Sequence, residues 1–408
     1  MTKSANDKLS LSRLRDREVR DDPYPFYAEM RLQDPVHWDD ALDFWVLTRY
    51  ADIASVYTDQ RFSRAQGLMR GFQRLPPIER QAAAPVYDTL AKTTFYTDPP
   101  YHTRLRGALN DSFAPRAMER LRPQIQEIVD QLLDAVRAAG RMDAIRDFAY
   151  TLPILVIARM LGLPAEERVR FKQWSDDLFA VLGTVHHSGG QMERASRSVT
   201  EMTEYVMKFS QASGGRSTGG LLRELAGDGD GPRLTQDELV ANVSMLLSAG
   251  HETTSNLIGN GLLALLQNPP QKNELRENPS RGASAIEEML RYDNPVQIAY
   301  RSAAEDVEVG GKLIRKGQLV NMILAAGNRD PERYSHPDRF DLDRDEGKHL
   351  GFGLGIHFCI GAALVRLEGQ IAFSTILREF PGLKLATDRW EWQDQPIFRG
   401  VKSLPVEF

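Results

Sequence analysis

The sequence contains very little cysteine and no long hydrophobic run. Cys359 is the only cysteine among 408 residues, so an intramolecular disulfide is impossible, which fits a reducing compartment. The best candidate for a membrane span, Leu152 to Pro164, is interrupted by Arg159 and falls short of the roughly 20 apolar residues required. The start, Met1 to Asp22, is polar and charged, without the apolar core of a signal peptide. We therefore expect a cytoplasmic protein.

The sequence also lacks a strong excess of charge of either sign. The formal net charge is -5, so no basic field points to nucleic acid as a partner. Hydrophobic residues make up 42% and charged residues 26%, which is ordinary for a globular protein. No low-complexity linker or short repeat divides the chain. We predict a polar, poorly ordered segment over residues 1–21 and one large domain over residues 22–408.

Most of the chain between Pro115 and Leu266 has a helical pattern, with apolar residues at spacings of three and four. This pattern is clearest over Ala117–Ala139, Leu152–Leu163 and Glu167–Leu182. Short strands are expected at Phe44–Thr48, Val307–Val309 and Leu319–Ile323, with a tight turn at Gly310-Gly311. We predict a mainly α protein of the α+β class, rich in helices and with small peripheral β-sheets.

One predicted helix is unusually long and carries residues that do not suit it. It begins at the capping box Thr235-Gln-Asp-Glu238 and ends near Asn268, before Pro269-Pro270. Some 30 residues give a length of roughly 45 Å, typical of a central core helix. Its middle, Ala249-Gly250-His251-Glu252-Thr253-Thr254, combines a glycine, a carboxylate and two β-branched residues. Such conflicts with local preference tend to mark functional sites.

A second helix ends with Glu288 and Arg291, just before Asn294-Pro295. Residues three apart share one face of a helix, and an isolated pair of this kind is usually a surface ion pair of little energetic value. The spacing alone therefore predicts no function.

The segment Gly351 to Gly361 is the most informative part of the sequence. Three alternating glycines permit backbone conformations that side chains would forbid, and a strong helix-forming run follows Gly361. Cys359 therefore stands at the start of a helix, where a thiolate is favoured. A single thiolate suits axial ligation of haem iron, which takes one protein ligand from that side.

The pattern F-G-x-G-x-H-x-C-x-G from Phe352 to Gly361 resembles the haem-binding loop of the cytochrome P-450 family. Further motifs follow the family's order along nearly the whole chain, from about Asp22. They are His102-x-x-x-Arg106, Ala249-Gly250-x-Glu252-Thr253-Thr254, Glu288-x-x-Arg291 and Pro337-Asp338-Arg339-Phe340. The resemblance implies a fold that holds haem b between the long central helix and the cysteine loop.

The resemblance also implies roles for individual residues around this haem. Cys359 would be the axial ligand of the iron. The other residues expected to contact the cofactor are His102, Arg106, Ala249, Gly250, Arg301, Phe352, Gly353, His357 and Gly361. Among them the two histidines and two arginines would neutralise the propionates through charge-assisted hydrogen bonds.

Three further sets of residues receive roles by the same resemblance. Glu252 and Thr253 would relay protons during dioxygen activation from a local distortion of the helix beside Gly250, whereas Thr254 is structural and His251 has no assigned role. Glu288, Arg291 and Arg339 would form a buried ion network that holds the cysteine loop. The substrate pocket would include Met245, Leu246, Ala249, Val296, Ile298 and Phe398. The segments Gly67–Thr94 and Phe179–His187 would also contribute to this pocket.

The function expected from these features is that of a monooxygenase, which hydroxylates or epoxidises a mainly apolar small molecule, such as a natural product or lipid. Electrons would come from a separate ferredoxin and ferredoxin reductase, with Arg104, Lys348 and Arg366 as a possible docking patch. We expect a monomer that binds neither nucleic acid nor membrane.

Several alternatives are weaker. A dinucleotide site fails because position 356 is isoleucine in place of the third glycine, and a zinc site at His349, His357 and Cys359 lacks further cysteine ligands. A peroxide-driven peroxygenase, a non-oxidative isomerase and a non-catalytic haem sensor would all have less use for Glu252 and Thr253.

Overall fold

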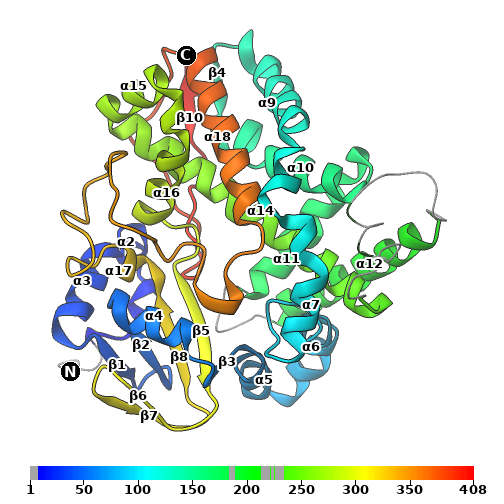
Figure 1. The fold of residues 1–408 in the computed structure, drawn as a ribbon, viewed down its shortest axis with the longest axis vertical. Helices are drawn as coiled ribbons and strands as arrows, with labels where there is room; N and C mark the ends of the chain where they lie inside the picture. The colour runs from blue at the N-terminus through cyan, green and yellow to red at the C-terminus, as the bar shows by residue number, and fades with distance from the viewer. Residues whose placement is uncertain (1–7, 183–188, 213–220, 222–224, 226–233) are drawn as a thin grey trace. The chain divides into compact units, whose positions relative to one another are not determined.

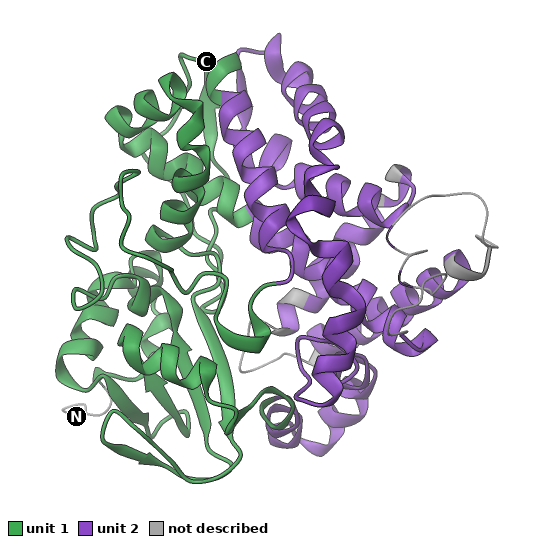
Figure 2. Ribbon diagram, viewed as in Figure 1, with its two compact units in different colours: residues 1–67, 256–359, 377–408 green, residues 68–255, 360–376 purple. Residues whose placement is uncertain are grey.

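The structure is a computed structural model that describes residues 8–182, 189–212, 221, 225 and 234–408. Its internal contacts divide it into two compact units (Figure 2). Unit 1 comprises residues 1–67, 256–359 and 377–408, and unit 2 comprises residues 68–255 and 360–376. Neither unit is a continuous stretch of sequence, so the single domain expected over residues 22–408 stays a prediction.

Unit 1 is built on a five-stranded sheet (Figure 1). The strand order is β1 (Val36–Asp39), β2 (Phe44–Leu47), β8 (Leu319–Ile323), β5 (Ile298–Ala303) and β3 (Phe62–Ser63). The β2–β8 pair is parallel and the other neighbours are antiparallel. A hairpin of β6 (Val307–Val309) and β7 (Lys312–Ile314) turns at Gly310 and Gly311, whose φ angles are +54° and +77°. The predicted strands and the predicted turn are thus confirmed.

The described remainder of unit 1 is mostly helical, apart from the antiparallel pair β9 (Lys384–Leu385) and β10 (Pro405–Glu407). Its helices are η1 (Leu11–Arg15), α2 (Arg17–Asp21), α3 (Tyr24–Gln33), α4 (Tyr50–Thr58), α15 (Pro269–Glu277), η5 (Pro279–Arg281), α16 (Gly282–Tyr292), α17 (Leu324–Asn328) and η6 (Gly355–His357).

The start of the chain is more ordered than expected. Residues 1–7 lie outside the described residues, but Leu11 and Leu14 are buried in a hydrophobic cluster with Phe26 and other residues of unit 1. The backbone N–H of Leu11 donates to a carboxylate oxygen of Asp39 at 2.9 Å. The prediction of a poorly ordered segment was wrong for residues 9–21, because the leucines among the charged residues of this segment supply an apolar face.

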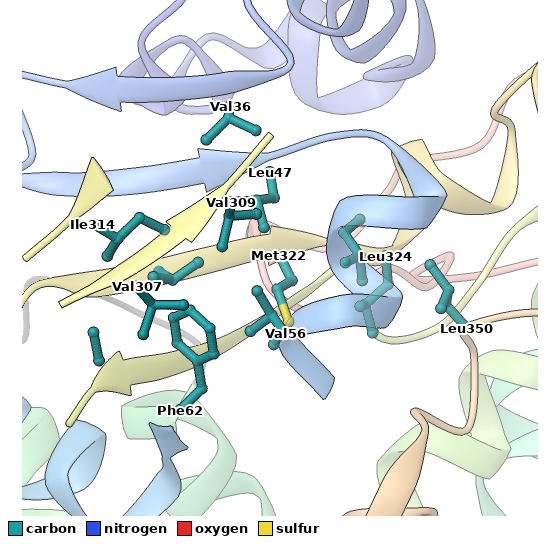
Figure 3. Packing of buried hydrophobic residues seen from close by; sticks show 13 residues of the cluster. Val36, Leu47, Val56, Phe62, Val307, Val309, Ile314, Met322, Leu324 and Leu350 are labelled. Carbon is teal, nitrogen blue, oxygen red and sulfur yellow. The ribbon is translucent and has the colours of Figure 1, made fainter. Parts of the chain in front are cut away.

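A second cluster of buried side chains joins the sheet to helix α4 and to the segment before the cysteine (Figure 3). Val36 and Leu47 belong to the sheet and Val56 belongs to α4. Leu350 is the residue directly before Gly351, where the cysteine loop begins. Leu350 is fully buried, so burial of its side chain fixes one end of the cysteine loop.

Unit 2 is almost entirely helical in its described residues. Besides the short strand β4 (Arg141–Asp143), it contains most of α5 (Arg64–Arg74), then α6 (Pro77–Leu90), α7 (Tyr101–Asn110), η2 (Asp111–Phe113), α8 (Pro115–Glu119), α9 (Arg122–Arg137), the π-helix η3 (Ala144–Ala149), α10 (Thr151–Leu161), η4 (Ala165–Glu167), α11 (Arg168–Leu182) and α12 (Gly189–Ala212). The predicted helices in this part of the chain are confirmed, although the first is divided between α8 and α9.

Two helices contribute to both units. They are α14 (Gln236–Gln267) and α18 (Ala362–Glu379). The capping box at the start of α14 is confirmed, since the N–H of Thr235 donates to the carboxylate of Glu238 at 2.8 Å and the N–H of Glu238 donates to the Thr235 hydroxyl at 3.3 Å. The mainly helical fold with small sheets is likewise confirmed. Among the described helices, none combines the length and the apolarity that crossing a membrane requires.

Candidate functional site

The cysteine loop is a tightly folded turn in unit 1. The N–H of Cys359 donates to the carbonyl of Phe352 at 2.9 Å, and the N–H of Gly353 donates to the carbonyl of Leu350 at 2.8 Å. Gly353 and Gly355 have φ angles of +66° and +68°, in the left-handed region. A Cβ at Gly355 would lie 2.6 Å from the backbone oxygen of Tyr57, so this position excludes every side chain. The backbone thus presents the half-buried thiol of Cys359 in a defined place.

A buried ion network is connected to this loop by hydrogen bonds. Arg291 and Glu288, each with a side chain 2% exposed, form two hydrogen bonds of 2.7 and 2.8 Å. Arg291 also donates to the carbonyl of Asn328, and the side-chain oxygen of Asn328 accepts the N–H of Leu350 at 2.7 Å. The pair of charges is therefore connected through Asn328 to the first residue before the loop.

The third member of the network is Arg344 rather than Arg339. The guanidinium of Arg344 lies 3.2 Å from the carboxylate of Glu288, whereas the side chain of Arg339 is 66% exposed. Arg339 contributes only its carbonyl oxygen, which accepts from Arg291 at 3.1 Å. The predicted role of the Arg339 side chain was wrong, because its carbonyl faces the network and its guanidinium faces solvent.

Unit 1 also contains three further residues that are expected to contact haem: Arg301, Phe352 and His357. Arg301 on β5 is 3% exposed, donates to the carbonyl of Tyr300 at 2.9 Å and lies over the ring of Tyr57. Phe352 is 7% exposed and packs edge-on against Phe358, at 6.0 Å between ring centroids. His357 is half-buried in the 3₁₀ turn η6.

In unit 2, helix α7 carries the first pair of predicted haem contacts. His102 is buried, and the half-buried Arg106 donates to the side chain of Asn110 at 2.9 Å. The neighbouring Arg104 is paired with Glu238, so the proposed docking patch has one member already engaged in an ion pair. Gly361 opens α18, since its carbonyl accepts the N–H of Val365 at 2.9 Å.

The centre of α14 is regular helix. The helix is uninterrupted from Gln236 to Gln267, so the distortion expected beside Gly250 is absent. The hydroxyl of Thr253 donates to the carbonyl of Ala249 at 2.7 Å, a bond within the preceding turn. Glu252 is half-buried. An added Cβ at Gly250 would make ordinary contacts with Ile157, so unit 2 by itself leaves room for alanine there.

A polar cluster around Glu252 escaped the sequence analysis. Asp176 of α11 and His251 offer ligand atoms within 4.8 Å of each other and of the Glu252 carboxylate. Tyr150 donates its hydroxyl to Asp176, and its carbonyl oxygen lies 3.1 Å from Nε2 of His251. Burial lowers the pKa of His251 to about 4, so its ring is neutral at physiological pH. Only the unexplained histidine inside an apolar helix could have signalled this cluster.

The residues predicted to line the substrate pocket are divided between the units. Met245, Leu246 and Ala249 lie on α14 in unit 2. In unit 1, Val296 and Phe398 form an isolated antiparallel bridge, while Ile298 packs in the same core cluster as Leu11 and Phe26. Of the segment Phe179–His187, residues 183–187 lie outside the described residues.

The donor set fits haem. In unit 1, a thiol held by a glycine-rich loop offers one soft ligand for iron, and the buried Arg301 offers a donor for a carboxylate. These residues do not fit the alternative of a zinc site at His349, His357 and Cys359. Within the described ranges, the only metal-ligating group of three or more acidic, histidine or cysteine side chains is that of Asp176, His251 and Glu252.

Comparison with known proteins decides the family. The sequence model of the family described as cytochrome P-450 matches residues 76–281 and 283–396. The chain belongs to the cytochrome P-450 family. It is 40% identical over 398 residues to the vitamin D(3) 25-hydroxylase of Pseudonocardia autotrophica, covering 94% of this chain and 93% of that protein. It is also 40% identical to the cytochrome P-450 monooxygenase PikC of Streptomyces venezuelae, covering 95% and 91%.

A solved structure agrees with these relatives. The structure of P450BioI in complex with an acyl carrier protein ligated to hexadec-9Z-enoic acid matches with a TM-score of 0.89 and 34% identity, covering 96% of this chain and 100% of that one. The expected family and fold are therefore confirmed. As a cytochrome P-450, the protein is a haem-containing monooxygenase whose relatives act in natural-product and biosynthetic chemistry.

Proposed function

We propose that this cytochrome P-450 hydroxylates or epoxidises a mainly apolar small molecule, with Cys359 as the axial ligand of its haem. The observation that carries the proposal is the cysteine loop. Its two glycines in the left-handed region and the bond from the Cys359 N–H to the Phe352 carbonyl hold the thiol in place. When bound, haem supplies the activation of dioxygen.

The residues of the chain would bind the haem, exclude water from the thiolate and transfer protons. His102, Arg106, Arg301 and His357 bind the haem propionates, and their positive charge offsets the negative charge of these groups. Ala249, Gly250, Gly353 and Gly361 allow the backbone to approach the cofactor, and Phe352 keeps water from the thiolate. Glu252 and the hydroxyl of Thr253 would hold and pass protons during dioxygen activation.

The haem is haem b, held without covalent links. Thioether attachment of a haem needs cysteines in addition to any axial cysteine ligand. Cys359 is the only cysteine in this sequence and serves as the ligand. An iron–sulfur cluster likewise needs several cysteine ligands. We infer that a separate ferredoxin and its reductase supply the electrons, as the family resemblance implies.

The substrate class rests on relatives that handle lipophilic molecules. Their names include a vitamin D(3) hydroxylase and a polyketide biosynthesis cytochrome P-450 of Bacillus subtilis, and one solved relative carries an acyl chain on a carrier protein. We infer an apolar natural product or lipid as substrate, contacted by Met245, Leu246, Ala249, Val296 and Phe398. Ile298, which packs in a hydrophobic cluster of unit 1, stays a proposed contact as well. The monomeric state and cytoplasmic location expected from the sequence stay predictions.

The first experiment is the absorption spectrum of the reduced protein exposed to carbon monoxide. A strongly red-shifted Soret band is expected for the wild type, and Cys359→Ala should lose this band while retaining its fold by circular dichroism. A wild-type spectrum typical of histidine ligation, or an unchanged band in Cys359→Ala, would overturn the proposal. Candidate substrates can then be screened by their shift of the ferric spectrum, and isotopically labelled dioxygen should appear in the product.

A further inference from the structure

Asp176, His251 and Glu252 bring together the donor set of a transition-metal site in unit 2. One carboxylate comes from α11, and the imidazole and the other carboxylate come from adjacent positions of α14. Their ligand atoms all lie within 4.8 Å of one another. Ligands around a tetrahedral zinc ion are about 3.4 Å apart, so the side chains must close by about 1 Å, which rotation of the two acidic side chains permits.

The imidazole of His251 has the state that a metal ligand requires. The ring is fully buried, and Nε2 lies 3.1 Å from the carbonyl of Tyr150. A carbonyl oxygen only accepts, so Nε2 carries the hydrogen and Nδ1 has a free lone pair. Nδ1 is buried and has no hydrogen-bond partner among the described residues. A buried lone pair without a partner is costly, and binding a cation would satisfy it.

The surroundings of these side chains also match a metal site. Histidine ligands nearly always donate their other ring N–H to a carbonyl or carboxylate, as His251 does to Tyr150. Ligating carboxylates are in turn hydrogen-bonded, as Asp176 is by the Tyr150 hydroxyl. The rings of Tyr150 and His251 meet edge-on at 4.2 Å, which fixes the orientation of the imidazole.

The charge of the cluster favours a cation. Asp176 is paired with the ammonium group of Lys172, whose Nζ lies 2.8 Å from its carboxylate. Burial and the negative charges of Asp176 and Glu252 raise the pKa of the Tyr150 hydroxyl well above its usual range, which indicates a negative potential at this point. Lys172 is 47% exposed, so it can leave Asp176 when a doubly charged ion arrives.

We propose that Asp176, His251 and Glu252 bind one divalent transition-metal ion of the zinc class, and that this ion inhibits turnover. Nitrogen and carboxylate ligands select such ions over magnesium. A metal-bound carboxylate of Glu252 cannot take up or release a proton. This inhibitory consequence rests on the proposed proton role of Glu252, whereas the binding does not.

Calorimetric titration of the ferric holoenzyme with zinc chloride tests the binding. One zinc ion is expected to bind per chain at this site, and magnesium chloride should not compete. Asp176→Asn and His251→Gln should each weaken binding by about tenfold or more, whereas Asp177→Asn changes an adjacent acid outside the group and should not. Lys172→Met removes the competing cation and should tighten binding.

Unchanged zinc affinity in Asp176→Asn and His251→Gln would overturn the proposed site. Each variant is first checked by its reduced carbon monoxide spectrum and thermal stability. If a variant does not fold, anomalous scattering from wild-type crystals soaked in zinc chloride decides the matter, since a peak between Asp176 and His251 supports the site and its absence refutes it.

Turnover measurements test the inhibition separately. Zinc should suppress product formation by the wild type and have at least tenfold less effect on Asp176→Asn. Equal inhibition of both proteins would refute the inhibitory role. A failure of the proposed monooxygenase function would appear in the carbon monoxide spectrum or in product analysis, and would leave the calorimetric result unchanged.

Discussion

Glu368, in the part of α18 that belongs to unit 2, allows a quantitative test of the energetics of burial. Its side chain is 2% exposed, and its Oε2 atom has no hydrogen-bond partner among the described residues. Burial without compensation raises the pKa of this carboxyl to about 8. The group is therefore neutral in the folded protein at pH 7, although it ionises in the unfolded chain.

The sign of the pH effect follows from this difference. The folded state retains a proton that the unfolded state releases near pH 4.5, so the carboxyl causes stability to fall as the pH rises from about 4.5 to 8. The slope reaches about 1.4 kcal/mol for each pH unit and is smaller near each pKa, so the loss between pH 5 and pH 8 is about 3.5 kcal/mol. Glu368→Gln cannot ionise, so the variant should lose about 3.5 kcal/mol less than the wild type over this interval.

Denaturant unfolding of the holoenzyme at pH 5, 6, 7 and 8, followed by far-UV circular dichroism, measures this difference. Any constant cost of burying the glutamine amide cancels when only the pH dependence is compared. Glu204→Gln replaces an exposed carboxylate on α12 of unit 2 and should follow the wild type. Equal pH dependence of Glu368→Gln and the wild type would refute the reasoning, because it would mean that the buried carboxyl does not hold its proton.

Three further predictions concern the haem site. Glu288→Gln leaves the buried guanidinium of Arg291 without its charge partner and should lower the free energy of unfolding by about 3 kcal/mol or more, measured by denaturant titration together with haem retention. Gly355→Ala should convert a large fraction of the red-shifted carbon monoxide band to the form without thiolate, whereas Gly382→Ala, with no atom near its added Cβ, should not. Thr253→Val should divert about tenfold more of the reducing equivalents to peroxide, and Thr253→Ser should restore product formation, measured as product per equivalent consumed.

The fold could be predicted from sequence where the determining signals are local. The capping box at Thr235 and the proline pair after Asn268 bound α14 correctly, because both act on the residues next to them. The start of the chain was misjudged for the opposite reason. Leu11 and Leu14 are few among many charges, and only their packing in unit 1 and the bond from Leu11 to Asp39 show that the segment is ordered.

The ion network shows where the sequence motif reaches its limit. The spacing of Glu288 and Arg291 predicts that they share a helix face, and the structure shows them buried together. The motif does not reveal which later arginine turns inward. Arg339 and Arg344 lie in an irregular segment, where no periodicity relates sequence position to direction, and the backbone path turns Arg344 toward Glu288.

At the centre of α14, polar residues inside an apolar helix predicted a functional site but not the structure around it. A histidine and a carboxylate inside an apolar helix indicate correctly that something other than packing selects these residues. We predicted that the helix would be distorted at these residues. The helix is regular, and the polar side chains lie next to polar partners from other parts of the chain. Those partners, Tyr150 and Asp176, precede His251 by about 100 and 75 residues, and their own sequence surroundings are unremarkable. Leaving a buried polar side chain unpaired is costly, whatever the distance in sequence to its partners. A polar residue inside an apolar helix therefore predicts that polar partners exist elsewhere in the chain, even where the sequence does not identify them.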